Sequence, residues 1–435
     1  MEIMSPSLIG GLGFIVLFLL MFLRMPIFLA FTAVGFIGLS LLTSFNVAAK
    51  TLIFTFWSYS LSYDLMAIPL YILMGTFAFH SDIGYDLYNA GSNWLGRIPG
   101  GLAIATTWGC AGFGAVTGSS ATGALAFGPI AYKPMVEHKY DIRLILGTIC
   151  CAPSMGLLIP PSIAFIVYGS ITDESIGKLF IAGIIPGILQ AVMYSIVILI
   201  LAGLGIWHGP AGPASTWKEK FISLKGIWGM LGLFLLVMGG LYGGIFTPTE
   251  GAAVGAVGAF VIFVIRKGIT WIPIRAALTE SLRTSCMIYM LVISSLIFAQ
   301  FIALAGLSTA LVDWILGLKV SPVLIVSVML AIYIVLGFPM PATPMIVLTV
   351  PLMYPILTKV FGLNGIWFGV LTVVMVEIAN ITPPVGINLF VVQGLFKETR
   401  LKDLYHGVTP FIIADLVRTA ILVAFPAISL WLIGE

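Results

Sequence analysis

Residues 154–162 read Ser-Met-Gly-Leu-Leu-Ile-Pro-Pro-Ser, and residues 377–385 read Glu-Ile-Ala-Asn-Ile-Thr-Pro-Pro-Val. Both stretches lie inside long apolar runs, so each double proline interrupts a helix that is otherwise suited to a membrane. The interruption frees carbonyl oxygens one turn back, and these suit a small hard cation such as sodium. The half-helix that follows presents its positive N-terminus, which suits an anion. Two such breaks in one chain predict paired binding sites.

The double prolines belong to an internal repeat. Pro160-Pro161 recurs as Pro383-Pro384, and Ala121-Thr122 recurs at nearly the same spacing as Ala342-Thr343. Further pairs follow in the same order: Gly183 and Pro186 with Gly407 and Pro410, Trp94 with Trp314, and Pro99 with Pro322. Because the offset in numbering drifts only from 220 to 224, the chain contains two related halves.

Each half also contains an apolar run that is too long for one straight span. Run 99–131 contains Gly114-Ala-Val-Thr-Gly-Ser-Ser-Ala-Thr-Gly123 at its centre, and run 321–358 contains Gly337-Phe-Pro-Met-Pro-Ala-Thr-Pro344. No continuous helix accommodates the second sequence, and irregular backbone at membrane depth must be buried in protein or line a wet cavity. We therefore expect two re-entrant helical hairpins. Small-residue packing between helices is the alternative interpretation of the first tip.

The amino-acid composition indicates that these apolar runs belong to a membrane protein. Of the 435 residues, 60% are hydrophobic and 9% are charged, and the mean hydropathy is +1.14. A soluble chain of this length needs far more polar surface. At about 20 residues for each span plus a connection, roughly a dozen spans fit in the lipid bilayer.

Lysine and arginine predict the orientation through the positive-inside bias. If both hairpins are re-entrant, one side collects most of the basic residues and is cytoplasmic: Arg24, Arg97, Lys133, Lys139, Arg143, Lys218, Lys220, Lys225, Arg266, Lys267, Arg275, Arg283, Lys397, Arg400 and Lys402. The other side receives Lys50, Lys178, Lys319 and Lys359, with Arg418 inside the last span. The N-terminus is then periplasmic. One hairpin opens inward and the other outward, so the repeats are inverted.

The predicted fold is an all-α polytopic membrane protein with inverted structural repeats, two re-entrant hairpins and two proline-broken helices. Residues 1–50 are expected to form N-terminal scaffold helices. The first repeat is 51–206, with an arm, hairpin 99–131, broken helix 142–171 and helix 178–206. Residues 207–283 supply scaffold helices and cytoplasmic loops, with an amphipathic connecting piece at 272–283. The second repeat is 284–435, with hairpin 321–358, broken helix 364–396 and last helix 408–433.

Few ionisable side chains lie within the spans. Asp415 and Arg418 are three residues apart and are expected to pair locally. Glu377 either has a functional role or makes a structural hydrogen bond to a neighbouring helix. The sequence has no HExxH, GxxxxGK[ST] or GxSxG motif, so neither an enzyme nor ATP-driven transport is expected, and no cofactor. The small net charge of +3, sorted by side, makes nucleic acid an unsuitable partner.

These motifs resemble the large membrane subunit of tripartite ATP-independent periplasmic (TRAP) transporters over nearly the whole chain. The resemblance is carried by the following stretches: Ala67-Ile-Pro-Leu70, Ile98-Pro-Gly-Gly-Leu102, Gly118-Ser-Ser120, Leu158-Ile-Pro-Pro-Ser162, Ser175-Ile-Gly-Lys178, Ala182-Gly-Ile-Ile-Pro186, Gly244-Ile-Phe-Thr-Pro-Thr-Glu250, and Ile381-Thr-Pro-Pro-Val-Gly386 with Asn388. This sequence departs from the family pattern at Pro341, where relatives often have an acidic residue.

The resemblance implies a sodium-coupled elevator transporter, similar to the ion transporter superfamily, in the bacterial inner membrane. It implies two partners, a small four-helix membrane subunit and a soluble periplasmic substrate-binding protein, and a small organic anion as substrate. It also implies two sodium sites. The first uses Thr117, Ser119, Ser120, Gly156, Ile159 and Pro161. The second uses Gly337, Thr343, Ala379, Thr382 and Val385.

The repeat places the tips and breaks opposite one another, so we expect the substrate near Thr122, Ser154, Thr343 and Asn388. Two other functions stay open at this point. One is a stand-alone divalent-anion/sodium symporter without a binding protein, and the other is a passive channel or structural membrane subunit.

Overall fold

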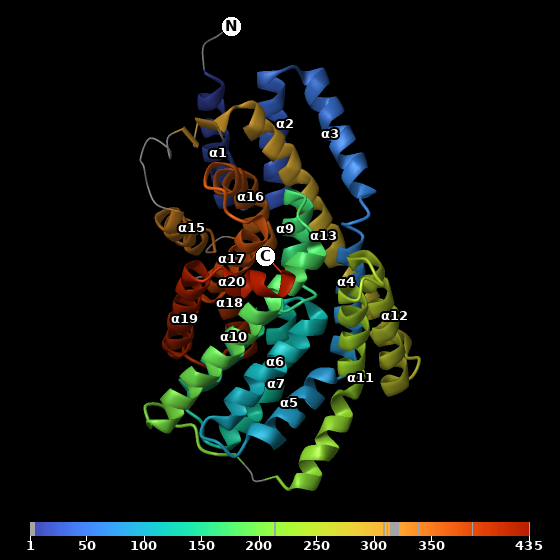
Figure 1. Ribbon diagram of the computed structural model, residues 1–435, viewed down its shortest axis with the longest axis vertical. Helices are drawn as coiled ribbons and strands as arrows, with labels where there is room; N and C mark the ends of the chain where they lie inside the picture. Colours follow the sequence, from blue (N-terminus) through green and yellow to red (C-terminus); the bar gives the residue numbers. More distant parts are fainter. Residues whose placement is uncertain are drawn as a thin grey trace.

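The computed structural model is an all-helical chain (Figure 1). It describes residues 5–212, 215–307, 309–310, 312–313, 322–337, 340–384 and 386–434. Six of the described helices are long and apolar enough to cross a bilayer: Ile176–Gly203, Trp217–Tyr242, Pro248–Lys267, Trp271–Leu304, Ala342–Val360 and Leu401–Ala424. Together with shorter apolar helices, they make this an all-helical membrane protein.

Seven helices outside the hairpins and breaks pack on one another. They are α1 (Pro6–Phe22), α2 (Ile27–Leu42), α3 (Phe45–Ser60), α4 (Ala67–His80), α11 (Trp217–Tyr242), α12 (Pro248–Lys267) and α13 (Trp271–Leu304). Helix α4 packs against α12 and α13, and α13 packs along α2. We call these seven helices the scaffold group.

The stretch Gly244–Glu250 has a structural explanation in this group. Thr247 is the N-cap of α12 and forms a capping box with Glu250, whose carboxylate accepts the Thr247 amide hydrogen at 2.8 Å. The Thr249 hydroxyl donates to the Tyr63 carbonyl at 3.0 Å, and the Tyr63 and Thr247 hydroxyls lie 3.0 Å apart. The stretch therefore starts α12 and ties it to the turn between α3 and α4.

The two halves of the chain contain corresponding long helices in the same order. The first half contains α5 (Ile83–Leu95), α6 (Gly101–Thr117), α7 (Ser120–Glu137), α8 (Ile142–Cys151), the 3₁₀ turn η1 (Ala152–Leu157), α9 (Ile163–Thr172) and α10 (Ile176–Gly203). The second contains α15 (Pro322–Leu336), α16 (Ala342–Pro355), the π-helical turn η2 (Ile356–Val360), α17 (Gly365–Ile381), α18 (Ile387–Leu395) and α19 (Leu401–Ala424), followed by α20 (Ala427–Leu430) and η3 (Trp431–Ile433). Equivalent helices begin at residue numbers that differ by nearly the same offset as the repeated sequence motifs. For example, α8 begins at Ile142 and α17 begins at Gly365.

The halves are interlocked. Helix α8 of the first half packs on α19 of the second, and its equivalent α17 packs on α10. In the same way α7 packs on α18, and α16 packs on α9. The α8–α19 crossing is backbone against backbone, because a Cβ added at Gly407 would lie 3.0 Å from the Gly147 nitrogen. The contacts between the two halves are thus reciprocal.

Two expected boundaries are wrong. The first repeat was expected to begin with an arm in the continuous apolar run at 51–80, but this run contains parts of two helices, α3 and α4, which are separated at residues 61–66. There Thr247 and Thr249 form hydrogen bonds with Tyr63, and Asp64 is exposed. The separate connecting piece at 272–283 does not exist, because α13 runs unbroken from Trp271 to Leu304. That segment contains neither glycine nor proline after Pro273, so nothing in it stops the helix.

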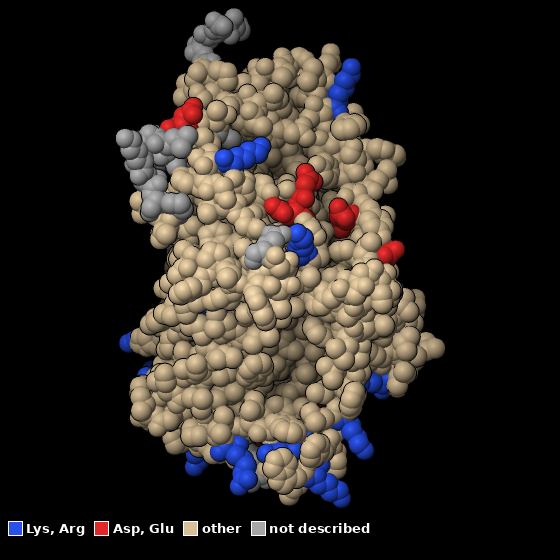
Figure 2. Space-filling model, in the orientation of Figure 1, with Lys and Arg blue, Asp and Glu red and all other residues tan. Residues whose placement is uncertain are grey.

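Basic side chains gather at one end of the molecule (Figure 2). That end includes the C-terminal end of α10 and the N-terminal end of α11 (Figure 1). Hydrogen bonds connect the chain segments near it: the Gly100 amide donates to the Gly209 carbonyl at 2.8 Å, and the Tyr140 hydroxyl donates to the Pro210 carbonyl at 2.8 Å. The expected cytoplasmic segments around residues 97, 139 and 218 therefore lie together.

Candidate transport site

The first predicted hairpin is formed by α6 and α7, which pack on each other through Phe113 and Phe127, with ring centroids 5.7 Å apart. The Leu102 amide, at the start of α6, donates to the Tyr140 hydroxyl, just after α7, at 3.2 Å. The chain therefore enters and leaves this hairpin at the same end. Its tip is the pair Gly118-Ser119, between the two helices.

The tip of this hairpin rests directly on the first break. Gly118 ends α6 with φ +61°, and a Cβ added there would lie 2.6 Å from the Pro161 carbonyl oxygen. A Cβ added at Gly114 would lie 2.6 Å from the Gly156 Cα. Only glycine permits this close approach combined with a left-handed backbone. The contact brings the backbone around Ser119 to Gly156 and Pro161, three residues predicted for the first sodium site.

The other residues predicted for this site lie in the same two elements. The Thr117 hydroxyl donates back to the Phe113 carbonyl at 3.1 Å, and Ser120 is buried at the start of α7. Ser119 is the N-cap of α7, and its hydroxyl lies 3.1 Å from the Thr122 hydroxyl. Ile159 packs its side chain against Gly187 of α10. The oxygen atoms that these residues could offer a cation are therefore backbone carbonyls and the Ser119 and Ser120 hydroxyls.

The first break is spanned by Ser162. Helix α8 tightens into η1, the chain passes the cis Pro160-Pro161 bond, and α9 begins at Ile163. The Ser162 hydroxyl accepts the Phe165 amide hydrogen at 3.3 Å and donates to the Leu157 carbonyl. One side chain therefore caps the new half-helix and binds the end of the old one.

The second hairpin meets the second break in the equivalent way. A Cβ added at Gly337, just after α15, would lie 2.6 Å from the Ala379 Cβ and 2.9 Å from the Ala379 oxygen. Helix α17 ends at Ile381, and Thr382 donates its hydroxyl to the Ile378 carbonyl at 2.6 Å. Thr343 lies half-buried in the first turn of α16, after Pro341 at the N-cap. Val385 lies outside the described residues.

Three of the four predicted substrate residues gather around the first break. Asn388 of α18 donates its amide to the Cys150 carbonyl at 3.1 Å, and among the described residues its Oδ1 has no hydrogen-bond partner. Thr122 precedes Gly123, where an added Cβ would touch the Pro153 side chain at 3.0 Å. Ser154 is fully buried. Thr343 belongs to the other tip, and no hydrogen bond within the described part of the chain joins it to these three.

Ser154 is already engaged by the protein. Its hydroxyl donates to the Cys151 carbonyl at 2.7 Å and accepts from Gln190 Nε2 at 3.1 Å. Gln190 lies on α10 and also donates to the Tyr194 hydroxyl at 3.3 Å. Ser154 therefore fixes the shape of the first break, and the Thr122 hydroxyl is bound to Ser119, whereas the Asn388 side chain retains hydrogen-bonding capacity for a ligand.

The ionisable residues of the spans form one cluster. Arg418 lies 3.2 Å from Asp415, which confirms the predicted local pair, and its Nη2 also donates to Glu377 Oε2 at 2.8 Å. Asp415 in turn accepts the Tyr194 hydroxyl at 2.6 Å. Sequence reasoning did not identify Gln190 or Tyr194. The available signal was their i, i+4 spacing on an otherwise apolar helix, which puts both side chains on one face.

Outside the membrane, α8 is anchored by its N-cap. Asp141 accepts the Arg143 amide hydrogen at 2.9 Å and the Arg143 guanidinium at 2.5 Å. The hydrogen bond from the Arg143 side chain lowers the pKa of the Asp141 carboxyl below its usual value. The carboxylate therefore stays ionised at the positive end of α8, the helix that leads to the first break.

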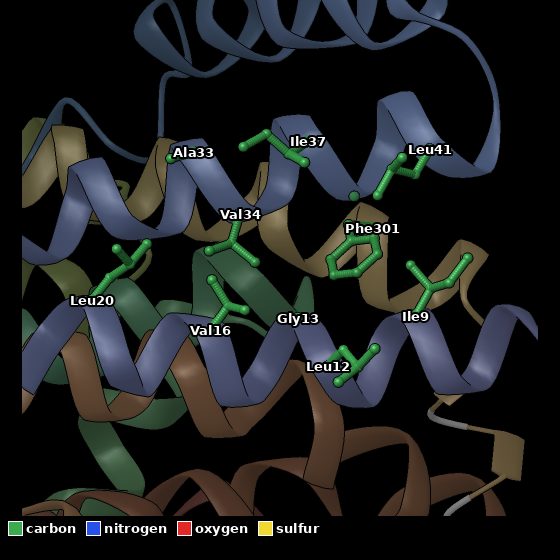
Figure 3. A pocket seen from close by; sticks show the side chains of 11 residues that line it. Ile9, Leu12, Gly13, Val16, Leu20, Ala33, Val34, Ile37, Leu41 and Phe301 are labelled. Atoms are coloured by element: carbon green, nitrogen blue, oxygen red, sulfur yellow. The ribbon is translucent and has the colours of Figure 1, made fainter. Parts of the chain in front are cut away.

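A pocket of about 550 Å³ lies elsewhere, between α1, α2 and α13 (Figure 3). Its side chains come from the apolar faces of these helices, including Leu12, Val34 and Phe301, and every lining residue is apolar or glycine. Such a pocket offers no hydrogen-bonding side chain to orient a polar solute. It is therefore not the candidate transport site.

The chain matches a known family over nearly its whole length. The family model described as "Tripartite ATP-independent periplasmic transporter, DctM component" covers residues 14–428. The chain is 34% identical over 370 residues to the C4-dicarboxylate TRAP transporter large permease protein DctM of Pseudomonas aeruginosa, across 85% of this chain and 86% of the relative. It is 32% identical to the ectoine TRAP transporter large permease protein TeaC of Halomonas elongata, across 85% and 86%.

A third relative is longer than this chain. The isethionate TRAP transporter permease protein DctMQ of Oleidesulfovibrio alaskensis is 31% identical across 86% of this chain and 58% of the relative. Among solved structures, the YdaH transporter of Alcanivorax borkumensis superposes with a TM-score of 0.60 at 16% identity, covering 89% of this chain and 88% of that one. At this identity the likeness concerns the fold alone.

Proposed function

The chain belongs to the DctM family of tripartite ATP-independent periplasmic transporters, and we propose that it is the sodium-coupled large membrane subunit of such an importer. It is a transporter and not an enzyme. The single observation that carries the proposal is the matched seating of each hairpin on its break, Gly114 on Gly156 and Gly337 on Ala379, two contacts related by the same offset of 223. Paired tips and breaks in inverted repeats are where secondary transporters bind substrate and ions.

Sodium is the coupling ion in this proposal. The first site consists of Thr117, Ser119, Ser120, Gly156, Ile159 and Pro161, and the second of Gly337, Thr343, Ala379, Thr382 and Val385. The breaks offer carbonyl and hydroxyl oxygens, which suit a hard cation. Two observations support the positions: the Ser119 backbone lies against Gly156, and the Thr382 hydroxyl lies at the end of α17.

The proposed substrate is a small organic anion, bound near Thr122, Ser154, Thr343 and Asn388. The sequence places no lysine or arginine in either tip or break. The anion is therefore held by amide groups at the starts of half-helices and by neutral side chains. Asn388 donates one Nδ2 hydrogen to the Cys150 carbonyl and has a second to donate to the anion, while its Oδ1, which has no hydrogen-bond partner in the described part of the chain, can accept from a bridging water. Thr122 can donate to the anion once its hydroxyl releases Ser119.

Transport by an elevator motion requires a moving unit and a fixed one. The interlocked helices α6–α10 and α15–α19 contain both hairpins and both breaks, and they form the proposed moving unit. The scaffold group stays fixed. Two partners complete the proposed system, a small four-helix membrane subunit and a periplasmic binding protein that delivers the solute, in a bacterial inner membrane. The name DctMQ of the longer relative and the word "tripartite" support them.

The test is uptake of a panel of dicarboxylates, sulfonates and ectoine into proteoliposomes. The chain is reconstituted with its small subunit and supplied with binding protein, in sodium or in choline at constant pH. The proposal expects uptake that requires sodium and the binding protein. Uptake that is unchanged in choline would contradict sodium coupling. Sodium-dependent uptake without binding protein would indicate a stand-alone symporter.

A further inference from the structure

Six buried side chains connect the first break to the second. Gln190 joins Ser154 to Tyr194, with distances of 3.1 Å and 3.3 Å, and Tyr194 donates to Asp415 at 2.6 Å. Arg418 then contacts Asp415 at 3.2 Å and Glu377 at 2.8 Å. Each of the six is at most 1% exposed. We call this series the polar chain.

The polar chain ends at equivalent positions of the two repeats. Ser154 and Glu377 are related by the same offset in numbering as the two double prolines. Each lies two residues before a backbone position of a proposed sodium site, Gly156 in η1 and Ala379 in α17. These are also the positions against which the hairpin tips rest.

The hydrogen bonds and ion pairs of the polar chain cannot be lost without leaving a buried polar or charged group unpaired. Gln190 uses its side-chain amide group on both Ser154 and Tyr194, so a shift of either partner leaves a buried donor unsatisfied. At the other end, Arg418 faces two carboxylates and all three side chains are buried, so loss of one contact leaves a buried charge under-compensated. The polar chain therefore either opposes a displacement of η1 or transmits it to α17.

We propose that Gln190 and Tyr194 are positioning residues that couple the two sodium sites, so that sodium at one site raises the affinity at the other. The proposal rests on the sodium sites of the proposed function. Hydrogen-bond networks that connect two sites carry coupling of this kind, and the coupling is reciprocal. Tyr194 links α10 of the first repeat to α19 of the second.

The experiment measures the initial rate of uptake against sodium concentration for the complete transporter in proteoliposomes. Wild type is expected to show a Hill coefficient well above 1. Tyr194→Phe removes only the hydroxyl and keeps the ring beside Phe411, whose centroid is 5.0 Å away. It is expected to bring the Hill coefficient close to 1 and to raise half-saturating sodium several-fold, with the maximal rate retained.

The matched control is Tyr168→Phe. Tyr168 is equally buried and donates to the Gly365 carbonyl at 2.6 Å, but it lies outside the polar chain. Its Hill coefficient is expected to equal that of wild type. Gln190→Met supplies a second break in the chain should Tyr194→Phe fold poorly. The double variant is expected to have the same Hill coefficient and half-saturating sodium concentration as either single variant, since both substitutions interrupt the same polar chain.

The outcomes separate this inference from the proposed function. If wild-type uptake ignores sodium, the proposed function fails. If wild-type uptake depends on sodium with a Hill coefficient of 1, or if Tyr194→Phe and Gln190→Met keep the wild-type coefficient, only the coupling role is overturned. A sodium-22 binding isotherm of the purified chain, measured for wild type and both variants, tests the coupling between the two sodium sites without a measurement of transport.

Discussion

The Tyr194 hydroxyl donates a 2.6 Å hydrogen bond to Asp415, and the two residues are 221 positions apart, within the range of offsets that relates the two repeats. The last helices of both repeats therefore meet in one buried polar contact, about one helical turn from the equivalent positions, since Gly183 and Pro186 are related to Gly407 and Pro410 by 224. Asp415 is held on its other side by Arg418, which also binds Glu377 of the second broken helix.

Arg418→Met is expected to destabilise the protein strongly. The substitution leaves Glu377 and Asp415 buried without a counter-charge, which costs about 3–5 kcal/mol when one partner of a buried pair is removed. Arg400→Met, an exposed change at the start of the same helix, is expected to stay within about 0.5 kcal/mol. Reversible denaturation in mixed detergent micelles measures both. Equal stability of the two variants would show that the buried arginine is not a structural charge.

Gly118→Ala is expected to abolish most uptake and lower stability. The alanine must adopt φ +61°, which costs roughly 1–2 kcal/mol, and its methyl group would collide with the Pro161 carbonyl. Gly205→Ala carries the same backbone strain at φ +69° but has open space around it. Comparing uptake and thermal midpoint of the two variants isolates the contact. Normal uptake by Gly118→Ala would contradict the seating of the first tip on its break.

Thr382→Ala is expected to raise half-saturating sodium about five- to tenfold, because one hydroxyl ligand is worth about 1–1.4 kcal/mol. Thr409→Ala is the control. It loses the same bond from a hydroxyl to a carbonyl four residues back, at 2.8 Å, in the unbroken helix α19. Thr349 is unsuitable, because its hydroxyl binds Tyr333 of the opposite hairpin arm. Unchanged sodium dependence in Thr382→Ala would remove this residue from the second site.

Thr122→Val and Asn388→Leu are each expected to raise the apparent substrate constant about tenfold or more. Losing one hydrogen bond to a buried charged group costs about 1–3 kcal/mol, and about 1.4 kcal/mol is a factor of ten. Thr172→Val, near the far end of α9, keeps the wild-type constant. Affinity for the binding protein, measured separately, stays unchanged in all three. Unaltered substrate constants would place the binding site elsewhere.

Single cysteines test the predicted orientation. Cys286 is exposed and must first be replaced, whereas Cys110, Cys150 and Cys151 are buried. In intact cells an impermeant thiol reagent is expected to label Lys359→Cys and not Lys133→Cys, two exposed positions predicted on opposite sides. The converse labelling pattern would refute the inverted arrangement of the hairpins.

The broken helices, both hairpins and the repeat were predictable because the proline and glycine residues that interrupt helices can be read directly from the sequence. The double prolines end α17 and separate η1 from α9, and Gly118 and Gly337 end α6 and α15 as expected. The split of the 51–80 run was not predictable, since Leu61–Met66 contains no breaker and the split accompanies hydrogen bonds from the distant Thr247 and Thr249.

The candidate site was predictable only where its contacts are local in the sequence. Sequence reasoning placed Asp415 next to Arg418, a local relation along one helix. It had no access to the contacts of Arg418 with Glu377 or of Gln190 with Ser154, because these depend on how helices from two repeats cross. Partners of a buried side chain on another helix are determined by packing, which a single sequence does not encode locally.

The crossing of α8 and α19 at Gly147 and Gly407 also has a consequence for biogenesis. More than half of the chain separates the two glycines, so the ribosome reaches Gly407 on the order of ten to fifty seconds after Gly147, at about 5–20 residues per second. During that interval the glycine face of α8 has no native neighbour. The nascent first half must therefore wait in the bilayer, shielded by lipid or an insertion chaperone, until the last helix leaves the translocon.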